Sequence, residues 1–223
     1  MIRLENNLRY LQVAFNYDLG LVKRLLPSIE YHPRIFIEAG TPFIKLEGMG
    51  GVRQISRMWK GLVIADIKTS DGALGEIGMS SAAGANAATV LGSCPTETLD
   101  LFVAECARYG MLSMIDMLGV EEPLAVMRPL SRPPDVVVIH RGRDEESTRG
   151  KVIRYKHINK IRSKYDVMIA AAGGVDLREA RSAIFNGANI VVVNLINPRD
   201  AWQGISTDSN VGVEVRKYLE EIG

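Results

Sequence analysis

Three ionisable residues follow one apolar run of the chain at a spacing that suits catalysis. Residues 61–65 have the composition of a buried strand, and Asp66, Lys68 and Asp71 come directly after them. Because side chains alternate along a strand, we expect Asp66 and Lys68 to share a face and Asp71 to lie in the turn before the next helix. Active sites of α/β folds form at the carboxyl ends of strands, so these charges are candidate catalytic groups. A buried Asp–Lys pair can also do no more than compensate its own charge.

Length and charge narrow the class of protein. The chain has 223 residues, and a (β/α)8 barrel has roughly 250 and can be as short as about 200, so we expect one domain over residues 1–223. Lysine and arginine number 27 against 26 aspartates and glutamates, which leaves a net charge of +1. No excess of positive charge is present to attract nucleic acid or an anionic membrane, and we expect neither as a partner.

The N-terminus and the cysteines predict a cytoplasmic protein. Residues 1–7 lack the basic start and apolar run of a signal peptide, and no stretch approaches the eighteen apolar residues of a membrane span. Cys94 and Cys106 lie among apolar residues and are too few for a disulfide framework.

Short apolar runs alternate with helix-length segments along the chain. Strands are expected over 10–15, 34–39, 61–65, 87–91, 111–116, 135–140, 167–171 and 190–194, and helices over 19–29, 51–59, a small-residue segment around 76–79, 96–109, 153–164, 176–186 and 211–222. Strands rich in valine and isoleucine with little polar alternation are typical of a parallel sheet buried on both faces. Eight such units predict an α/β fold of the (β/α)8 TIM-barrel type. The alternative is an open doubly wound sheet, but residues 16–20 lack the glycine-rich turn that it would place after the first strand.

Polar residues end nearly every expected strand. In chain order they are Asn16, Glu38, the group of Asp66, Lys68 and Asp71, Ser93, Asp116, His140 with Arg143, the pair Gly173 and Gly174, and Asn194. Each has a structural explanation when taken alone: Glu38 can cap a turn, Asp116 can cap a helix, and His140 can be a core imidazole. Their concentration on one rim of a barrel favours an active site.

The residue types indicate sugar chemistry assisted by a metal. Glu38 and Asp66, from adjacent strands, supply the hard oxygen ligands that suit Mg²⁺, which takes only one or two carboxylates. Lys68 among carboxylates should stay protonated, so it suits stabilising an enediolate oxygen better than forming a Schiff base. His140 is the natural proton carrier, and Arg143 could clamp an anionic group of the substrate.

A glycine pair precedes the expected seventh helix. Gly173 and Gly174 would let backbone N–H groups approach a phosphate at a helix N-terminus, as barrels often do after strands seven and eight. Turn geometry can also require glycine at such positions.

The chain resembles the orotidine 5′-phosphate decarboxylase suprafamily, and within it most closely the 3-hexulose-6-phosphate synthases. The most specific motifs are Glu-x-Gly-Thr-Pro at 38–42 and Asp-x-Lys-x-x-Asp at 66–71. The matching segments are 11–14, 37–42 with 47–48, 65–71, 89–93, 115–121, 140–145 and 172–175.

The resemblance implies a TIM barrel that forms a homodimer with active sites at the subunit interface. It implies that Asp71 reaches into the partner's site and that Mg²⁺ is held by Glu38 and Asp66. It also implies that Lys68 stabilises an enediolate and that His140 moves protons. Asp116 joins the catalytic residues by the same resemblance, and the expected substrate-binding residues are Asn16, Glu38, Thr41, Arg143, Gly173 and Gly174.

Three positions depart from the family's pattern. Asn16 stands where members usually carry Asp, and Arg143 is more like the sister 3-keto-L-gulonate-6-phosphate decarboxylases. The glycine-rich phosphate turn after the eighth strand is replaced by residues 194–198, where side chains of Leu195 and Ile196 would block a phosphate and Arg199 could substitute.

The sequence therefore predicts a Mg²⁺-dependent lyase acting on a phosphosugar, with aldol addition of formaldehyde to ribulose 5-phosphate, or its reverse, as the favoured reaction. Asp116 favours the synthase, because the decarboxylase carries Glu there, whereas Arg143 favours the decarboxylase. A barrel that has lost the reaction and binds a phosphorylated metabolite or a partner protein is the alternative from a different class.

Overall fold

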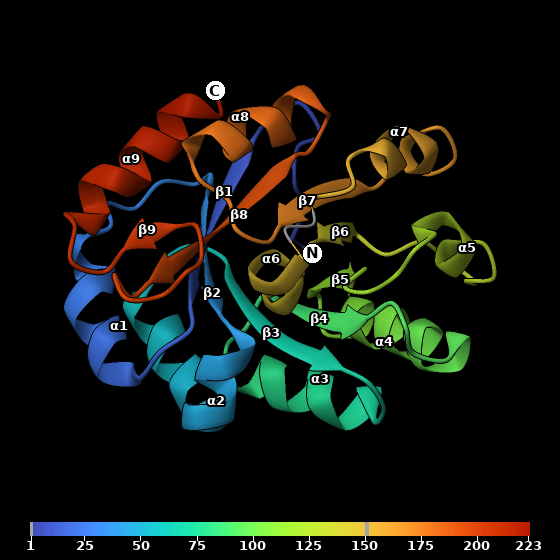
Figure 1. Cartoon of the computed structure of the whole chain (residues 1–223). Helices are drawn as coiled ribbons and strands as arrows, with labels where there is room; N and C mark the ends of the chain where they lie inside the picture. The colour runs from blue at the N-terminus through green and yellow to red at the C-terminus, as the bar shows by residue number, and fades with distance from the viewer. Residues whose placement is uncertain (1, 150–151) are drawn as a thin grey trace.

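Eight parallel strands close into a barrel in the computed structural model, which describes residues 2–149 and 152–223 (Figure 1). The strands are hydrogen-bonded in sequence order, and β1 pairs with β8 as well as with β2. This closure makes the fold a (β/α)8 TIM barrel and excludes the open doubly wound sheet.

The strands are β1 Tyr10–Phe15, β2 Ile35–Ala39, β3 Val63–Thr69, β4 Ala87–Leu91, β5 Leu112–Asp116, β6 Val136–His140, β7 Met168–Ala172, β8 Ile190–Ile196 and a short β9 Ile205–Ser206. The helices are α1 Leu19–Leu25, the 3-10 turn η1 Leu26–Ser28, α2 Thr41–Met58, α3 Ala73–Ala82, α4 Thr96–Arg108, α5 Pro123–Met127, α6 Arg143–Arg149, α7 Lys156–Arg162, α8 Leu177–Phe185 and α9 Val211–Glu221.

The predicted strands and helices are confirmed in order and type, and the main differences are in the extent of two elements and in two additional ones. Helix α2 begins at Thr41 rather than at residue 51, since Pro42 suits its first turn and a kink at Gly48 (φ +61°) joins two helical pieces. Strand β3 continues to Thr69 instead of ending before Asp66. Helix α6 and strand β9 were not expected; β9 pairs with an extended end of β8.

Apart from the end of β3, side chains along the strands alternate between the barrel interior and the helical layer. The interior set lies within one cluster of buried residues, made of Tyr10, Ala14, Phe36, Ile64, Ala87, Leu112, Met114, Val136, Val138, Met168, Ala170, Ala172, Ile190 and Val192. The rings of Tyr10 and Phe36 stack with centroids 4.9 Å apart. Leu4, Leu8 and Leu62 pack against this cluster. The interior is therefore filled by apolar side chains, and the carboxyl ends of the strands are where barrels of this kind place their active sites.

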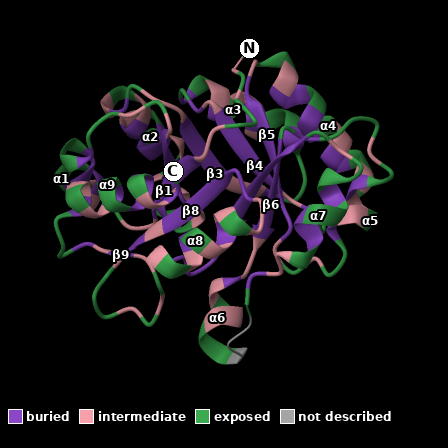
Figure 2. Ribbon diagram, turned by 90° about the horizontal axis from the view of Figure 1, so that it is seen from above, coloured by how far each residue is buried: buried purple, intermediate pink, exposed green. Residues whose placement is uncertain are grey.

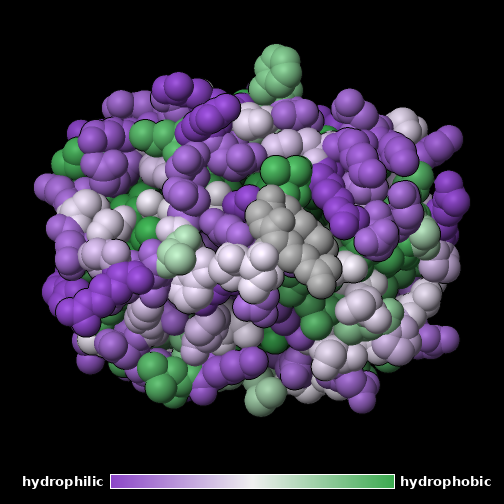
Figure 3. All heavy atoms as spheres, in the orientation of Figure 1, coloured by the Kyte–Doolittle hydropathy of each residue, from purple (hydrophilic) through white to green (hydrophobic). Residues whose placement is uncertain are grey.

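The helices cover the barrel with one buried and one exposed face each. Figure 2 shows buried strands at the centre, exposed outer helix faces, and α6 projecting from the end of the barrel opposite the N-terminus. Polar residues cover most of the face seen in Figure 3, with separate apolar patches between them. Within residues 2–149 and 152–223, the longest apolar helical stretch falls short of what crossing a membrane requires.

Candidate active site

One cavity of about 600 Å³ opens at the carboxyl end of the strands and gathers the predicted residues. Eleven of the residues named from the sequence line it: Asn16, Glu38, Thr41, Asp66, Lys68, Asp116, His140, Arg143, Gly173, Gly174 and Asn194. Most of these side chains lie two residues beyond the last interior-facing apolar residue of their strand, so they face the same side. This is why the residues at the strand ends could be identified from the sequence. Asp71 and Ser93 are the exceptions: both are exposed and neither is among the residues lining this cavity. The carboxylate of Asp71 accepts a hydrogen bond from the backbone N–H of Gly72 at 2.8 Å.

A local irregularity of β3 aims Lys68 into the cavity. The register of β3 against β4 shifts between Ala65 and Thr69, and Lys68 has φ +46°, a left-handed conformation that non-glycine residues rarely adopt. The backbone N–H of Lys68 donates to Oγ1 of Thr89 on the neighbouring strand at 2.9 Å. Asp66 and Lys68 do lie together as expected, but through a bulge and not through regular strand alternation.

The ammonium of Lys68 lies between two carboxylates. Its Nζ is 3.0 Å from Oδ1 of Asp66 and 2.6 Å from Oδ2 of Asp116. Burial disfavours the charged form, but the charges of Asp66 and Asp116 outweigh burial, so the pKa of Lys68 is raised. The lysine therefore stays a cation, as the sequence predicted, and is unsuited to act as an amine nucleophile.

Asp116 joins Lys68 to His140. Nδ1 of His140 lies 2.9 Å from both carboxylate oxygens of Asp116, and the backbone N–H of Leu118 donates to Oδ1 at 3.0 Å. Burial opposes the charge of Asp116, but His140 and Lys68 more than compensate, and its pKa is lowered. Since Nδ1 is engaged and the ring is held, Nε2 of His140 is the nitrogen positioned to exchange a proton with a ligand.

Asp66 is held by its neighbours on both oxygens. Oγ1 of Thr41 donates to Oδ2 at 2.7 Å, and Oγ1 of Thr89 donates to Oδ1 at 2.8 Å. Thr41, expected to bind substrate, thus lines the cavity and also fixes Asp66.

Glu38 is a buried carboxylate whose hydrogen-bond partner is a neutral amide. Nε2 of Gln12 donates to its Oε2 at 2.5 Å, and burial together with the charge of Asp66 raises the pKa of Glu38 to about 7. A carboxylate whose ionisation is disfavoured by burial and by a neighbouring carboxylate suits a divalent cation. In the part of the chain that the structure describes, no group of three or more His, Cys, Asp or Glu is arranged for a metal. Carboxylate oxygens are the hard ligands that suit Mg²⁺, which takes one or two of them from a protein.

The far side of the cavity carries amides in place of charges. Nδ2 of Asn16 donates to Oδ1 of Asn194 at 3.0 Å, joining the ends of β1 and β8. A Cβ at Gly40 would stand 2.2 Å from Oδ1 of Asn16, so the glycine of the Glu-x-Gly-Thr-Pro motif leaves room for this amide.

The glycine pair is required by the protein itself. Gly173 and Gly174 have φ +108° and +63°, and a Cβ at Gly173 would stand 2.0 Å from the backbone oxygen of Arg141. Helix α8 is capped by Asp176, whose Oδ1 accepts from the backbone N–H of Glu179 at 2.7 Å. The residues after β7 thus form a tight turn under Arg141.

In place of the family's glycine-rich phosphate turn, β8 continues to Ile196, pairs with β9 and is followed by a loop. Leu195 is buried and pairs with β9, and neither Leu195 nor Ile196 is among the residues lining the cavity. The hydroxyl of Tyr17 donates to Asp200, and burial, then this bond, raises the pKa of Tyr17 to about 12. Arg143 lies 4.0 Å from the ring centroid of Trp202, a cation–π contact at the rim.

Several residues of the cavity were not named as site residues from the sequence, among them Gln12, Thr89, Arg141, Glu146 and Trp202. Gln12 and Thr89 lie a few residues before the ends of β1 and β4. Because every second side chain of a strand faces the same side, counting back in steps of two from Asn16, and likewise along β4, would have placed them inside the barrel. No sequence signal marks the others, whose positions depend on α6 and on the loop after β8.

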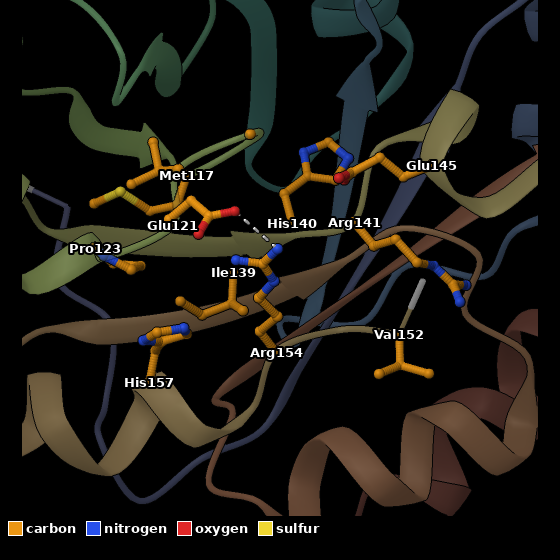
Figure 4. Close-up of a pocket in the computed structure, with 12 residues that line it drawn as sticks. Met117, Glu121, Pro123, Ile139, His140, Arg141, Glu145, Val152, Arg154 and His157 are labelled. Carbon is orange, nitrogen blue, oxygen red and sulfur yellow. Dashed lines mark hydrogen bonds and ion pairs between the residues drawn. The ribbon is translucent and has the colours of Figure 1, made fainter. Parts of the chain in front are cut away.

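A second, smaller cavity lies beside His140 and Arg141. It measures about 50 Å³ and is lined by Met117, Glu121, Pro123, Ile139, Arg154 and His157 among others. Figure 4 shows Arg154 reaching across it to Glu121, at 3.4 Å. His157 is buried here and burial lowers its pKa, so this imidazole is neutral at physiological pH.

Replacing Asp116 tests the charged chain. Asp116→Asn leaves Lys68 and His140 without their shared carboxylate, and we expect the free energy of unfolding at pH 7 to fall by about 3 kcal/mol. Because a lowered carboxyl pKa contributes stability above its unfolded pKa, the difference from the parent should shrink as the pH falls below about 4. Urea denaturation at several pH values measures this. Asp208→Asn, a matched change at an exposed position, should leave stability nearly unchanged; an equal loss in both variants would refute the assignment.

Replacing Glu38 should have the opposite sign. A raised carboxyl pKa means that ionised Glu38 destabilises the fold above pH 7, so Glu38→Gln should increase the free energy of unfolding there, by an amount on the order of 2 kcal/mol. The gain should vanish below about pH 4.5, where the parent residue is protonated in both states. Thermal unfolding at pH 8 and pH 4 measures it, with exposed Glu220→Gln as the charge-matched control. A destabilised Glu38→Gln at pH 8 would contradict the mutual repulsion of Glu38 and Asp66.

Comparison with known proteins agrees with this geometry. The chain is 37% identical over 186 residues to the bifunctional enzyme Fae/Hps of Methanothrix thermoacetophila, covering 82% of this chain and 47% of that protein. The chain thus spans about half the length of the curated relatives it matches. Its fold is similar to 3-hexulose-6-phosphate synthase of Salmonella typhimurium, with a TM-score of 0.80 and 24% identity over 96% of this chain and 98% of that one.

A second fold neighbour is 3-keto-L-gulonate-6-phosphate decarboxylase of Vibrio cholerae, with a TM-score of 0.72 and 17% identity over 97% of this chain and 98% of that one. The family model that matches describes the orotidine 5′-phosphate decarboxylase / HUMPS family and covers residues 11–194. With the barrel and the residues at its rim, this match shows that the chain belongs to the orotidine 5′-phosphate decarboxylase / HUMPS family of enzymes.

Proposed function

We propose that the chain is a Mg²⁺-dependent carbon–carbon lyase that joins formaldehyde to ribulose 5-phosphate, or catalyses the reverse cleavage, through an enediolate. The observation that carries the proposal is the ammonium of Lys68, held between Asp66 and Asp116 inside the cavity and one carboxylate away from His140. A fixed cation is what a developing enediolate oxygen needs. The name of the 37% identical relative supports the synthase reaction over others of the family.

Glu38 and Asp66 would hold the magnesium ion, which supplies Lewis-acid polarisation of neighbouring sugar oxygens when bound. Metal ligands must be deprotonated, so the raised pKa of Glu38 implies that a proton competes with the metal near neutral pH. Gln12 and Thr41 hold the two carboxylates in place for this role.

His140 and Lys68 divide the chemical steps between them. Nε2 of His140 takes the proton from the carbon next to the sugar's carbonyl, and the electron pair of that C–H bond forms the enediolate, whose oxygen faces the Lys68 ammonium. The enediolate carbon then forms a bond to the carbonyl carbon of formaldehyde, and the resulting alkoxide takes the proton back. Asp116 stabilises the imidazolium that exists between the two transfers.

A decarboxylase is the second candidate, and the observation that favours it is Arg143 at the rim of the cavity. Lys68 and the same magnesium ion would stabilise the enediolate left after loss of carbon dioxide from 3-keto-L-gulonate 6-phosphate. A barrel without turnover that binds a phosphorylated metabolite or a partner protein remains the alternative from a different class.

The decisive experiment follows formaldehyde. With Mg²⁺ and ribulose 5-phosphate, the parent protein should consume formaldehyde, EDTA should stop it, and Lys68→Ala should lower kcat by about 10²–10³-fold, because it removes the charge opposite the enediolate. Lys68→Ala should still bind ribulose 5-phosphate, which separates catalysis from folding.

If formaldehyde persists with the parent, carbon dioxide release from 3-keto-L-gulonate 6-phosphate is measured next. Release would support the decarboxylase, and no turnover of either substrate would support the binding barrel.

We also propose a homodimer in which Asp71 completes the partner's site. Two features support it: Asp71 does not line the cavity of its own chain, and α3, which follows it, exposes Leu74 and Met79 at 53% and 54%. Apolar side chains exposed together are typical of an interface.

Mixing two inactive variants tests the shared site. Lys68→Ala and Asp71→Ala should each be inactive, but equal amounts allowed to exchange subunits should recover about a quarter of the parent's activity, since half of the dimers carry one intact site. Each variant incubated alone is the control. Absence of recovery despite mixed dimers in native mass spectrometry would place Asp71 outside the partner's site.

A further inference from the structure

Two segments that are far apart in the sequence meet at the rim over the end of β7. Helix α6 follows β6, and residues 197–204 follow β8. Arg143 of α6 lies over the ring of Trp202, and Glu146 of α6 accepts a hydrogen bond from the backbone N–H of Gln203 at 3.2 Å. Figure 1 shows α6 in front of the strand ends. The contacts with Trp202 and Gln203 tie α6 to the loop after β8 above the cavity.

The carboxylate of Glu146 is well enclosed there. Its Oε1 lies 3.6 Å from Nη2 of Arg141, and the two side chains are only 12% and 13% exposed. Arg141 in turn donates from its guanidinium to the backbone oxygens of Gly173 at 2.7 Å and of Gly174 at 3.1 Å. One anion thus meets a guanidinium and a backbone N–H beside a glycine turn.

The space over Gly174 is filled by the same carboxylate. A Cβ built at Gly174 would stand 2.2 Å from Oε2 of Glu146 and 2.3 Å from Nη2 of Arg141. The missing side chain of Gly174 is therefore what admits the anion. Proteins bind phosphate with groups of this kind: a guanidinium, a backbone N–H from a loop, and a glycine that lets the anion come close.

We propose that the carboxylate of Glu146 occupies the place of the substrate's phosphate and must leave it before a phosphosugar can bind. The inference rests on the proposed function for the identity of the substrate. It concerns only the competition between two anions for one cradle, formed by the guanidinium of Arg141, the backbone N–H of Gln203 and the open space over Gly174. A carboxylate and a phosphate cannot share this cradle, because like charges at contact distance repel. The protein described here is consequently a closed form, and Glu146 reduces the fraction of molecules that are competent to bind.

A different role would give a different result. If Glu146 only braces α6 against the loop after β8, removing its charge would loosen the rim and weaken the binding of phosphate. The competition model predicts the reverse, since freeing the cradle raises the competent fraction and tightens apparent affinity by the same factor.

The test measures binding without turnover. Inorganic phosphate is titrated into the parent and into Glu146→Gln by calorimetry, and we expect the variant to bind about tenfold more tightly. Glu146→Gln keeps an oxygen that can accept from Gln203 but loses the negative charge. Glu220→Gln, an exposed change of the same charge on α9, should bind phosphate as the parent does.

A second comparison separates charge from general loosening. Glu146→Gln should bind ribulose 5-phosphate more tightly than the parent does, and it should leave the affinity for ribulose, which has no phosphate, unchanged. Circular dichroism checks folding, and Glu146→Ala serves as a second variant should Glu146→Gln fold poorly.

Equal or weaker phosphate binding by folded variants would overturn the inference, as would tighter binding of ribulose. This outcome is independent of the formaldehyde assay: tighter phosphate binding with no turnover would leave the competition intact and refute the synthase. Turnover with unchanged phosphate affinity would do the opposite.

Discussion

The site depends on keeping the ammonium of Lys68 charged inside the barrel, so that its proton does not pass to a neighbouring carboxylate. Lys68 is largely buried, and only the two carboxylates of Asp66 and Asp116 make its charge stable there. Those carboxylates are in turn held by Thr41, by Thr89 and by the imidazole of His140. Breaking a buried ion pair on one side is far more destabilising than never forming it, so these groups must be ordered together.

The backbone supports this arrangement by adopting an unfavourable conformation at Lys68. A left-handed conformation at a lysine is unfavourable by about 1–3 kcal/mol, and the structure retains it because Thr89 binds the backbone N–H of Lys68. Glu38 and Asp66 add a second unfavourable pairing, visible in the raised pKa of Glu38. Both unfavourable features lie at the rim, whereas the cluster below them consists of buried apolar side chains, so the core stabilises what the site destabilises.

The fold and most of the site could be predicted from the sequence because both follow from strand periodicity. Once eight apolar runs close a barrel, the residue at each strand end must face the mouth, and this placed Asp116 and His140 correctly. The bulge at Lys68 could not be predicted, since it depends on a threonine from the next strand. Helix α6 was missed for a similar reason: its acidic residues have no apolar periodicity, and contacts with Trp202 and Gln203 hold it.

The glycine pair after β7 shows why residue type alone does not identify a ligand. Gly173 is required by the backbone oxygen of Arg141 whether or not phosphate binds, and Gly174 is required by whatever anion stands over it. In this structure that anion is Glu146, supplied by an adjacent helix of the same chain. The same three groups that hold a carboxylate can hold a phosphate, so the occupant is decided by relative affinity and not by shape. Whether the cradle serves substrate is therefore a question about the charge at position 146, and the glycines carry no information on it.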